Sequence, residues 1–458
     1  MTLSLQPRGG RTLLRHALAM ALAAGLGGAL LDAVPALAKD KEQAPAAPKI
    51  SLSGKFAPVY QETVKKIEAA KARPDVVAAG AKYSAAADGA SQKAAAAELA
   101  GLLGAERSQV QTAVAAATTP DDHYAAGQLE LTLGQMSHDN TLTSQGLKDM
   151  IASGKDPADT GKFEFYVANF AYEDGNYPDA ISAMEAAKAA GFQNDQLGIV
   201  LADSYIKNKQ LDKGLPALQA AIDANKAAGQ PVPASWYRVG VVSAYNAKML
   251  DAALRFGMGL VSLDPTSKNW ALVLEVLEAV GHYDSQEQLD LLRLMARTHS
   301  FAQKTDYLEY IQAADARRLP GEVLDVIAAG EAAGKLSPGD PSVADARAVA
   351  QAHVTADRAS LPGLEHDARA PGATALVASA AADAMLSYGH AQDAVELYGI
   401  ALGKPGVDAP RVLTRLGIAQ TDAGDLAGAQ ATFAKVTGPR QPLAQLWSIY
   451  AQTKAQAK

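Results

Sequence analysis

Apolar residues recur along most of this chain at intervals of three and four, the spacing that places them on one face of an α-helix. One such stripe is formed by Val167, Ala168, Ala171 and Tyr172. Gly175 follows it and can adopt the left-handed conformation that often ends a helix. The pattern predicts an all-α protein in which short turns join two-sided helices.

The turns that enter these helices recur at a nearly constant step. They lie at Tyr177, Leu211, Leu250, Tyr283, Pro320, Ala391 and Leu426. The gaps between them are 34, 39, 33, 37, 71 and 35 residues, and the gap of 71 corresponds to two steps. A period in this range predicts stacked helical hairpins, because one hairpin cannot bury its apolar face without neighbours. Similar phrases close three of the units, at Gly191, Gly229 and Gly334.

These units resemble tetratricopeptide repeats, a family with conserved large and small positions on both helices of each hairpin. The matching positions include Trp236, Gly240, Trp270, Gly281, Tyr283, Ala394, Tyr398, Gly417, Ala429 and Phe433. The resemblance implies an all-α, right-handed α-solenoid of helix-turn-helix repeats over residues 120–440.

Other segments are expected to flank or interrupt the repeats. Residues 56–119 are alanine-rich and predict an N-terminal helical cap, and residues 441–458 predict a C-terminal capping helix. Residues 336–372 contain Pro338, Pro341, Pro362 and Pro371, so we expect this stretch to be irregular, as a degenerate unit or a kink.

One helix departs from the repeat pattern. After Tyr283, the positions expected to hold Ala and an aromatic residue are Gln286 and Asp290. We therefore expect this helix to rotate or slide, and to bury Leu289, Leu292 and Met295 instead.

The start of the chain has the features of a cleaved secretory signal peptide over residues 1–38. Arg8, Arg11 and Arg15 precede an apolar run, and Ala36 and Ala38 offer the small residues that a signal peptidase reads. The 15-residue run from Ala17 spans roughly 22 Å as a helix, short of the ~30 Å hydrocarbon core. We expect cleavage after Ala38 rather than a membrane anchor.

The composition limits the cellular compartments and the classes of partner that we expect for this protein. Residues 39–55 are polar and contain two prolines, which predicts a flexible linker. Cysteine is absent, which leaves no disulfide and no lipidated cysteine. Without residues 1–38, Lys and Arg number 39 and Asp and Glu 48, a net charge of −9. We expect a periplasmic or secreted protein that neither binds nucleic acid nor inserts stably into a membrane. Its oligomeric state stays open.

No arrangement of residues predicts catalysis. We expect no cofactor and no metal, and we interpret Glu365-His366-Asp367 as a solvated loop and Asp121-Asp122 as helix capping. A peptidoglycan-cleaving enzyme would need a catalytic Glu in a separate domain, and the repeats leave little room for one. Hydrolase or accessory activity on the cell wall is the weakest alternative.

The resemblance instead implies a protein-binding role in the cell envelope, since the first helix of each repeat lines a groove for a peptide or a partner helix. Carried over by position, the groove set is Phe165, Asn169, Tyr172, Asp203, Ile206, Tyr237 and Tyr245. The same aromatic side chains could instead pack against neighbouring helices. The main functional alternative is a self-associating spacer or oligomer subunit.

Overall fold

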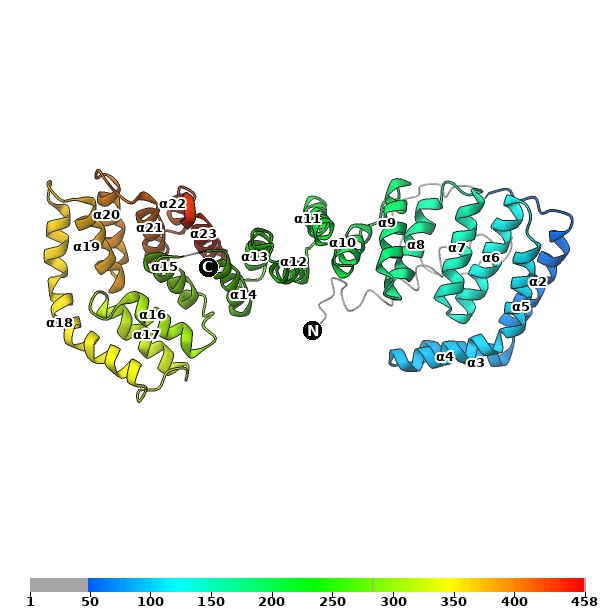
Figure 1. Ribbon diagram of the computed structural model, residues 1–458, viewed down its shortest axis with the longest axis horizontal. Coiled ribbons are helices and arrows are strands. Elements are labelled where there is room, and N and C mark those ends of the chain that lie inside the picture. The colour runs from blue at the N-terminus through cyan, green and yellow to red at the C-terminus, as the bar shows by residue number, and fades with distance from the viewer. Residues whose placement is uncertain (1–47, 282, 457–458) are drawn as a thin grey trace. The chain divides into compact units, whose positions relative to one another are not determined.

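The computed structural model describes residues 48–281 and 283–456, and over these residues it contains 22 α-helices, one short 3₁₀ helix and no strand (Figure 1). The predicted all-α class is confirmed. The signal peptide and residues 39–47 of the linker lie outside the described residues. The chain divides into two compact units, which meet in sequence between Val232 and Pro233.

The first unit contains the helices α2 to α11. Their bounds are α2 (Phe56–Lys71), α3 (Pro74–Ala85), α4 (Gly89–Leu102), α5 (Gly104–Ala116), α6 (Pro120–Ser137), α7 (Asn140–Ser153), α8 (Thr160–Glu173), α9 (Tyr177–Ala189), α10 (Leu197–Lys207) and α11 (Leu211–Ala227).

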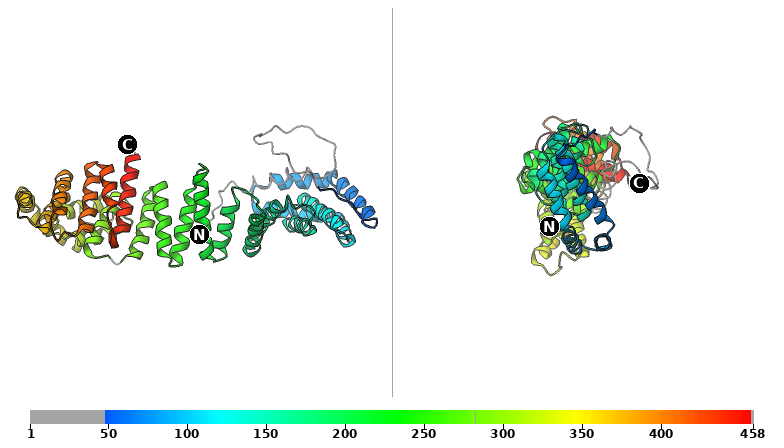
Figure 2. Two further views of the ribbon diagram at one scale, coloured as in Figure 1. Left: turned by 90° about the horizontal axis from the view of Figure 1, so that it is seen from above. Right: turned by 90° about the vertical axis from the view of Figure 1, so that its right-hand side faces the viewer.

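The second unit contains α12 to α23 and the 3₁₀ helix η2. Their bounds are α12 (Ala234–Asn246), α13 (Leu250–Leu263), α14 (Ser267–Val280), α15 (Ser285–Arg297), α16 (Lys304–Ala314), α17 (Pro320–Ala332), α18 (Pro341–Arg369), α19 (Ala375–Ser387), α20 (Ala391–Leu402), α21 (Ala409–Ala423), α22 (Leu426–Phe433), η2 (Gly438–Arg440) and α23 (Gln441–Gln456). In the left view of Figure 2, the orange to red helices α19 to α23 run roughly parallel.

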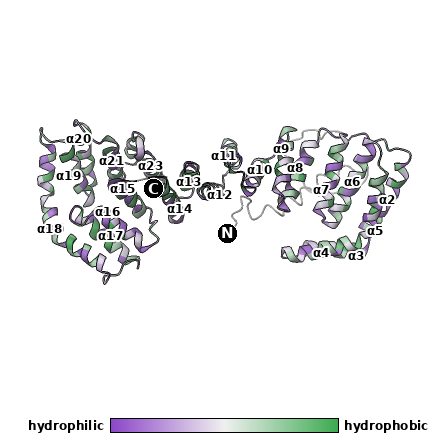
Figure 3. Ribbon diagram, viewed as in Figure 1, coloured by the Kyte–Doolittle hydropathy of each residue, from purple (hydrophilic) through white to green (hydrophobic). Residues whose placement is uncertain are grey.

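The predicted turn positions coincide with helix starts. Tyr177, Leu211, Leu250, Pro320, Ala391 and Leu426 are the first residues of α9, α11, α13, α17, α20 and α22, and Tyr283 lies just before α15. Consecutive helices pair as hairpins, among them α6/α7, α8/α9 and α10/α11 in the first unit and α12/α13 and α19/α20 in the second. Most helices carry both hydrophilic and hydrophobic residues, as expected for amphipathic helices (Figure 3). The repeated helical hairpin is therefore confirmed.

Small residues allow the paired helices to approach closely. A Cβ added to Gly146 on α7 would lie 2.5 Å from the backbone oxygen of Gly127 on α6, so neither position tolerates a side chain. Ala180 on α9 is fully buried against α8. The predicted closing residues Gly191, Gly229 and Gly334 have φ of 78°, 67° and 66°, the left-handed conformation that glycine adopts without strain.

The predicted N-terminal cap is helical, and residues 48–55 before it are bound to the first unit. Residues 48–55 lead into α2, and the Ser51 and Ser53 backbone N–H groups donate to Asp121 Oδ2 at 2.8 Å and Asp122 Oδ1 at 2.9 Å. Ile50 packs against the apolar core of this region. A flexible linker is therefore wrong for these residues, because they bind the start of α6. Asp122 also forms a capping box with Thr119, which confirms the capping interpretation.

The stretch 336–372 is more regular than expected, because most of it is one helix, and the alternative of a kink stays a prediction. Residues 341–369 form one continuous helix of 29 residues, α18, with Pro362 inside it. Pro341 occupies the first turn, where its missing N–H costs nothing, and Pro371 follows the helix end. Two of the prolines thus bound a helix rather than divide a loop. Glu365, His366 and Asp367 lie on this helix, not in a loop.

Within residues 48–281 and 283–456, no helix combines the length and the apolar composition that crossing a membrane requires.

Replacing Ala180 by Trp is expected to force α8 and α9 apart. Overpacking a core typically costs about 1–3 kcal/mol, and a fully buried site between two helices should exceed that range. Thermal unfolding followed by far-UV circular dichroism measures the change. Ala189→Trp, at an exposed position on the same helix, is the control. Equal melting temperatures for the two variants would contradict the pairing.

A carboxyl pair inside the first unit predicts a second stability effect. Glu130 on α6 is buried, and burial together with the adjacent Asp149 on α7 raises the pKa of Glu130 to about 8. The folded state thus holds a proton that the unfolded chain, with a Glu pKa near ~4.3, releases. The resulting stabilisation is complete below the unfolded pKa and is lost as pH rises through about 8.

We expect the melting temperature of the first unit to fall between pH 6 and pH 9, and Glu130→Gln to flatten that fall. Glutamine keeps a neutral group in place at every pH, so its advantage over the native residue should grow with pH. Circular dichroism melts at several pH values measure this, with the exposed Glu98→Gln as control. Parallel pH profiles of the melting temperature for the native chain and Glu130→Gln would refute the raised pKa of Glu130.

Candidate functional site: a pocket beside a buried charge network

The predicted groove residues are mostly buried and contact their own chain. Phe165, Asn169, Tyr172, Asp203 and Tyr237 are buried, while Ile206 and Tyr245 are half-buried. The first five in chain order belong to the first unit, and Tyr237 and Tyr245 belong to the second.

Tyr172 and Asp203 are brought together in one cluster that links α8 to α10. The Tyr172 hydroxyl donates to Asp203 Oδ2, and Lys207 Nζ lies 2.9 Å from the same oxygen. Lys207 Nζ also donates to the Tyr172 hydroxyl at 2.6 Å and lies 4.4 Å from the ring centroid. Burial, reinforced by Asp203, raises the pKa of Tyr172 to about 12. The cluster joins two neighbouring hairpins.

The other predicted groove residues also make intramolecular contacts. The Asn169 side chain donates to the backbone oxygen of Phe165 at 2.7 Å. The Phe165 ring lies 5.3 Å from the ring of Phe192. Tyr237 lies so close to α13 that a Cβ on Gly259 would be 2.3 Å from its ring. Phe165, Tyr172, Asp203 and Tyr237 thus contact other segments of their own chain, and their part in a groove stays a prediction.

The second unit has a distinct feature at α15, which is buried on nearly every side. Leu289 and Leu292 are fully buried in an apolar core, and Met295 packs at its edge, as the departure from the repeat pattern predicted. The opposite side of the helix bears Asp290 and Arg293, which are also buried. A helix with charges on a buried face requires charged partners, because an unpaired buried charge is costly.

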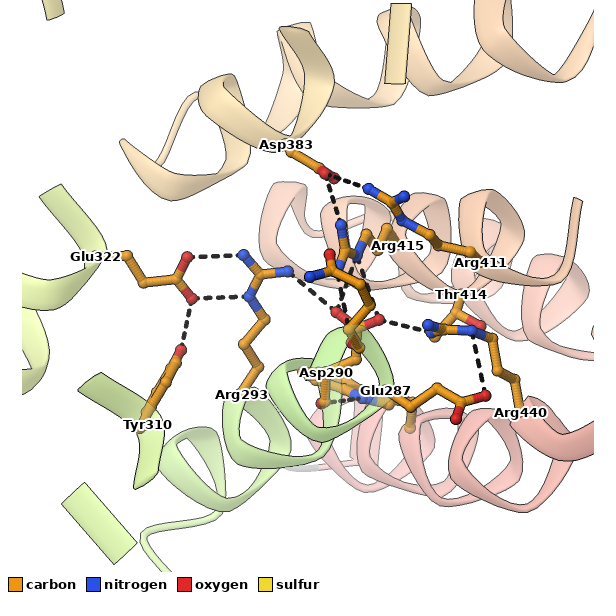
Figure 4. Close-up of polar contacts among 12 residues, drawn as sticks. Glu287, Asp290, Arg293, Tyr310, Glu322, Asp383, Arg411, Thr414, Arg415 and Arg440 are labelled. Atoms are coloured by element: carbon orange, nitrogen blue, oxygen red, sulfur yellow. Dashed lines mark hydrogen bonds and ion pairs between the residues drawn. The ribbon is translucent and has the colours of Figure 1, made fainter. Parts of the chain in front are cut away.

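Asp290 lies at the centre of a network of such charged partners (Figure 4). Its carboxylate accepts from Arg293 Nη1 at 3.1 Å, from Arg415 Nε at 3.0 Å and from Arg440 Nη1 at 2.8 Å. Its backbone oxygen accepts from Trp447 Nε1 at 3.1 Å. One residue on α15 therefore binds α21, η2 and α23, which lie far along the chain.

Two further carboxylates bind the same arginines. Arg293 donates to Glu322 on α17 through Nε at 2.8 Å and Nη2 at 2.7 Å, a bidentate pair. Asp383 on α19 accepts from Arg415 Nη1 at 2.6 Å and from Arg411 Nη2 at 2.8 Å. The network thus reaches helices α17 and α19 as well.

The network is electrically balanced. Its four arginines, Arg293, Arg411, Arg415 and Arg440, face four carboxylates, Glu287, Asp290, Glu322 and Asp383. Burial alone would raise the pKa of Glu322, but Arg293 beside it holds the pKa below its ordinary value. Burial likewise acts against the charge of Asp383, and Arg415 and Arg411 keep its pKa lowered.

These contacts bring α15 against the C-terminal helices of the second unit. Asp290 and Arg415 are 125 residues apart, yet α15 lies beside α21 (Figure 1). Arg297 extends the contact through a paired hydrogen bond to Asp422, with its Nε 2.9 Å from Oδ1. Trp270 on α14 contacts Tyr450 on α23, with ring centroids 6.4 Å apart. The predicted C-terminal capping helix is a helix, α23, and it packs against α13 as well as α22.

A pocket of about 660 Å³ lies next to the network, inside the closed arrangement. Its wall comes from α15, α16, α17 and the ends of α19 and α21. The apolar and aromatic part of that wall comprises Ala296, Phe301, Tyr307, Tyr310, Val326, Ala329, Ala333 and Leu386. The charged part comprises Arg293, Arg297, Glu322, Asp325 and Asp422, and His299 also lines the pocket.

One signal in the sequence pointed to this site. Gln286 and Asp290 broke the repeat pattern, and both bind Arg415, since Arg415 Nη2 donates to Gln286 Oε1 at 3.0 Å. Nothing in local periodicity could identify the partner 125 residues away. In the part of the chain that the structure describes, His, Asp and Glu side chains form no cluster suited to a metal ion.

Comparison of the chain with protein-family models and with curated proteins finds no match.

Replacing Asp290 by Ala is expected to destabilise the second unit by about 3–5 kcal/mol, since it leaves arginines buried without their shared acceptor. All three native tryptophans lie in this unit, so tryptophan fluorescence during denaturant unfolding reports on it alone. Glu396→Ala removes an exposed partner of Arg369 and is the control, with little change expected. A similarly small change for Asp290→Ala would mean that the network adds no net stability.

Proposed function

We propose that this chain is an exported, non-enzymatic binding protein of the cell envelope, a solenoid of tetratricopeptide-like hairpins that binds a peptide segment of a partner protein. Export rests on the features of residues 1–38. The hairpin series and its period of about 35 residues support the repeat architecture.

The pocket in the second unit is the observation that carries the binding role. Its volume of about 660 Å³ lies within the ~300–1,000 Å³ range of ligand sites. It combines an apolar and aromatic wall with a few charged groups, the composition that recognises side chains of a partner. The volume exceeds that of one side chain, so a short stretch of peptide can enter.

The state of its charged groups favours binding over catalysis. Arg293 is bound to Glu322, and Arg297 to Asp422. Groups held in ion pairs fix the shape of the pocket, and His299 is the lining residue of the type that acid-base catalysis uses most often. A preformed pocket with a rigid wall also lowers the entropy that binding would otherwise cost.

Filling the pocket tests the proposal. Ala329 lies in the wall and is exposed, so Ala329→Trp should occupy the space without disturbing a buried contact. We expect the native chain to retain a partner from envelope extract and the variant to lose at least about nine-tenths of it, a loss of ~1.4 kcal/mol in binding. Quantitative mass spectrometry of the co-purified proteins measures the difference.

Ala356→Trp, at an exposed position of α18 outside the pocket, is the matched control and should retain the partner. Matching melting temperatures establish that all three proteins are folded. Equal capture by Ala329→Trp and the native chain would remove the pocket from the binding site. Capture of nothing but further copies of this chain would favour a self-associating spacer instead.

A further inference from the structure

One face of α17 lines the pocket. Glu322, Asp325, Val326, Ala329 and Ala333 recur at helical spacing along it, with Ala333 capping the helix end. Glu322 and Val326 are buried, whereas Asp325, Ala329 and Ala333 are exposed. The two alanines are small, so they leave room above the helix.

Some charged side chains around this face have a direct hydrogen-bonded or ion-paired partner, and one does not. Glu322 accepts from Arg293 and from the Tyr310 hydroxyl, the latter at 2.7 Å. Arg297 is bound to Asp422. Asp325 makes no hydrogen bond or ion pair with any other residue that the structure describes, and the nearby Arg358 stacks on Tyr388, 5.1 Å from its ring centroid. Among the described residues, Asp325 is therefore the carboxylate of the pocket wall that has no direct partner, although the charge of Arg358 acts on it.

Another part of the pocket wall suits an aliphatic chain. Phe301 and Tyr307 contact each other edge to face, with centroids 4.8 Å apart, and Leu386 lines the same space. A flexible methylene stem fills such a space and can carry a cationic head beyond it. The aromatic faces add attraction for a cation that passes near them.

We propose that the pocket binds a lysine or arginine side chain of the partner peptide, with its stem against the apolar wall and its cationic head on the Asp325 carboxylate. This inference rests on the proposed peptide-binding function and adds the chemical class of the residue recognised. An acidic side chain is disfavoured, because the arginines of the wall are already bound and Asp325 would repel it.

The surroundings of Asp325 agree with an empty cation site. Partial burial, and then the charge of Glu322, raise the pKa of Asp325, while the charge of Arg358 acts in the opposite direction. The carboxylate has no hydrogen-bonded or ion-paired partner among the described residues, so an incoming cation can bind it directly. The exposed, unpaired position also means that Asp325→Asn should leave the fold unchanged.

The test selects ligands from a library of random short peptides displayed on phage. The whole chain is the target, and peptides that also bind Ala329→Trp are removed. We expect the selected peptides to share a lysine or arginine. The tightest binder and its counterpart with norleucine at that position are then titrated by fluorescence anisotropy against the native chain, Asp325→Asn and Asp345→Asn. Asp345 is exposed on α18 outside the pocket and matches the charge change.

Asp325→Asn should weaken the lysine or arginine peptide about tenfold and leave the norleucine peptide unchanged, while Asp345→Asn affects neither. Selected peptides without a basic residue, or equal loss of both peptides with Asp325→Asn, would overturn the cation site and leave the peptide pocket in place. Failure to select any peptide that depends on Ala329 would overturn the peptide pocket itself.

Discussion

Asp290 is the point on which the second unit depends. Its fully buried carboxylate accepts hydrogen bonds from Arg293, Arg415 and Arg440, and its backbone oxygen accepts one from Trp447. Each arginine would be costly to bury alone, and each is compensated only if helices far apart in sequence meet. Apolar contacts between hairpins would tolerate several arrangements. A balanced set of buried charges tolerates few, so it specifies one closure of the helices.

The pocket follows from this closure. Its wall draws on α15, α16 and α17 and on the ends of α19 and α21, which meet because the network joins them. Glu322 belongs both to the network and to the wall, so the network also fixes the position of α17. Asp325 and Ala329, which are exposed on that helix, are the residues at which we propose that a partner binds. Structure and proposed function thus share the same few side chains.

Local structure could be predicted from the sequence, and long-range closure could not. The helix starts at Tyr177 and Pro320 could be predicted because the apolar period of a helix and the residues of a turn are both local features of the sequence. The prolines around α18 were misread, since Pro341 can begin a helix as readily as break one. Tyr172 was predicted to line a groove, and the sequence did not reveal that Asp203 and Lys207 bind its hydroxyl. Arg415 gave no signal, because periodicity does not encode a partner 125 residues away.

Cross-linking across the closure tests the central claim most directly. The chain has no cysteine, so Arg297→Cys with Asp422→Cys creates a single reactive pair where α15 meets α21. A short bismaleimide should join the two cysteines within one chain, and the yield should collapse when Asp290→Ala is added. Absence of an intramolecular cross-link in the otherwise native background would contradict the account, because it would mean that these helices are not neighbours.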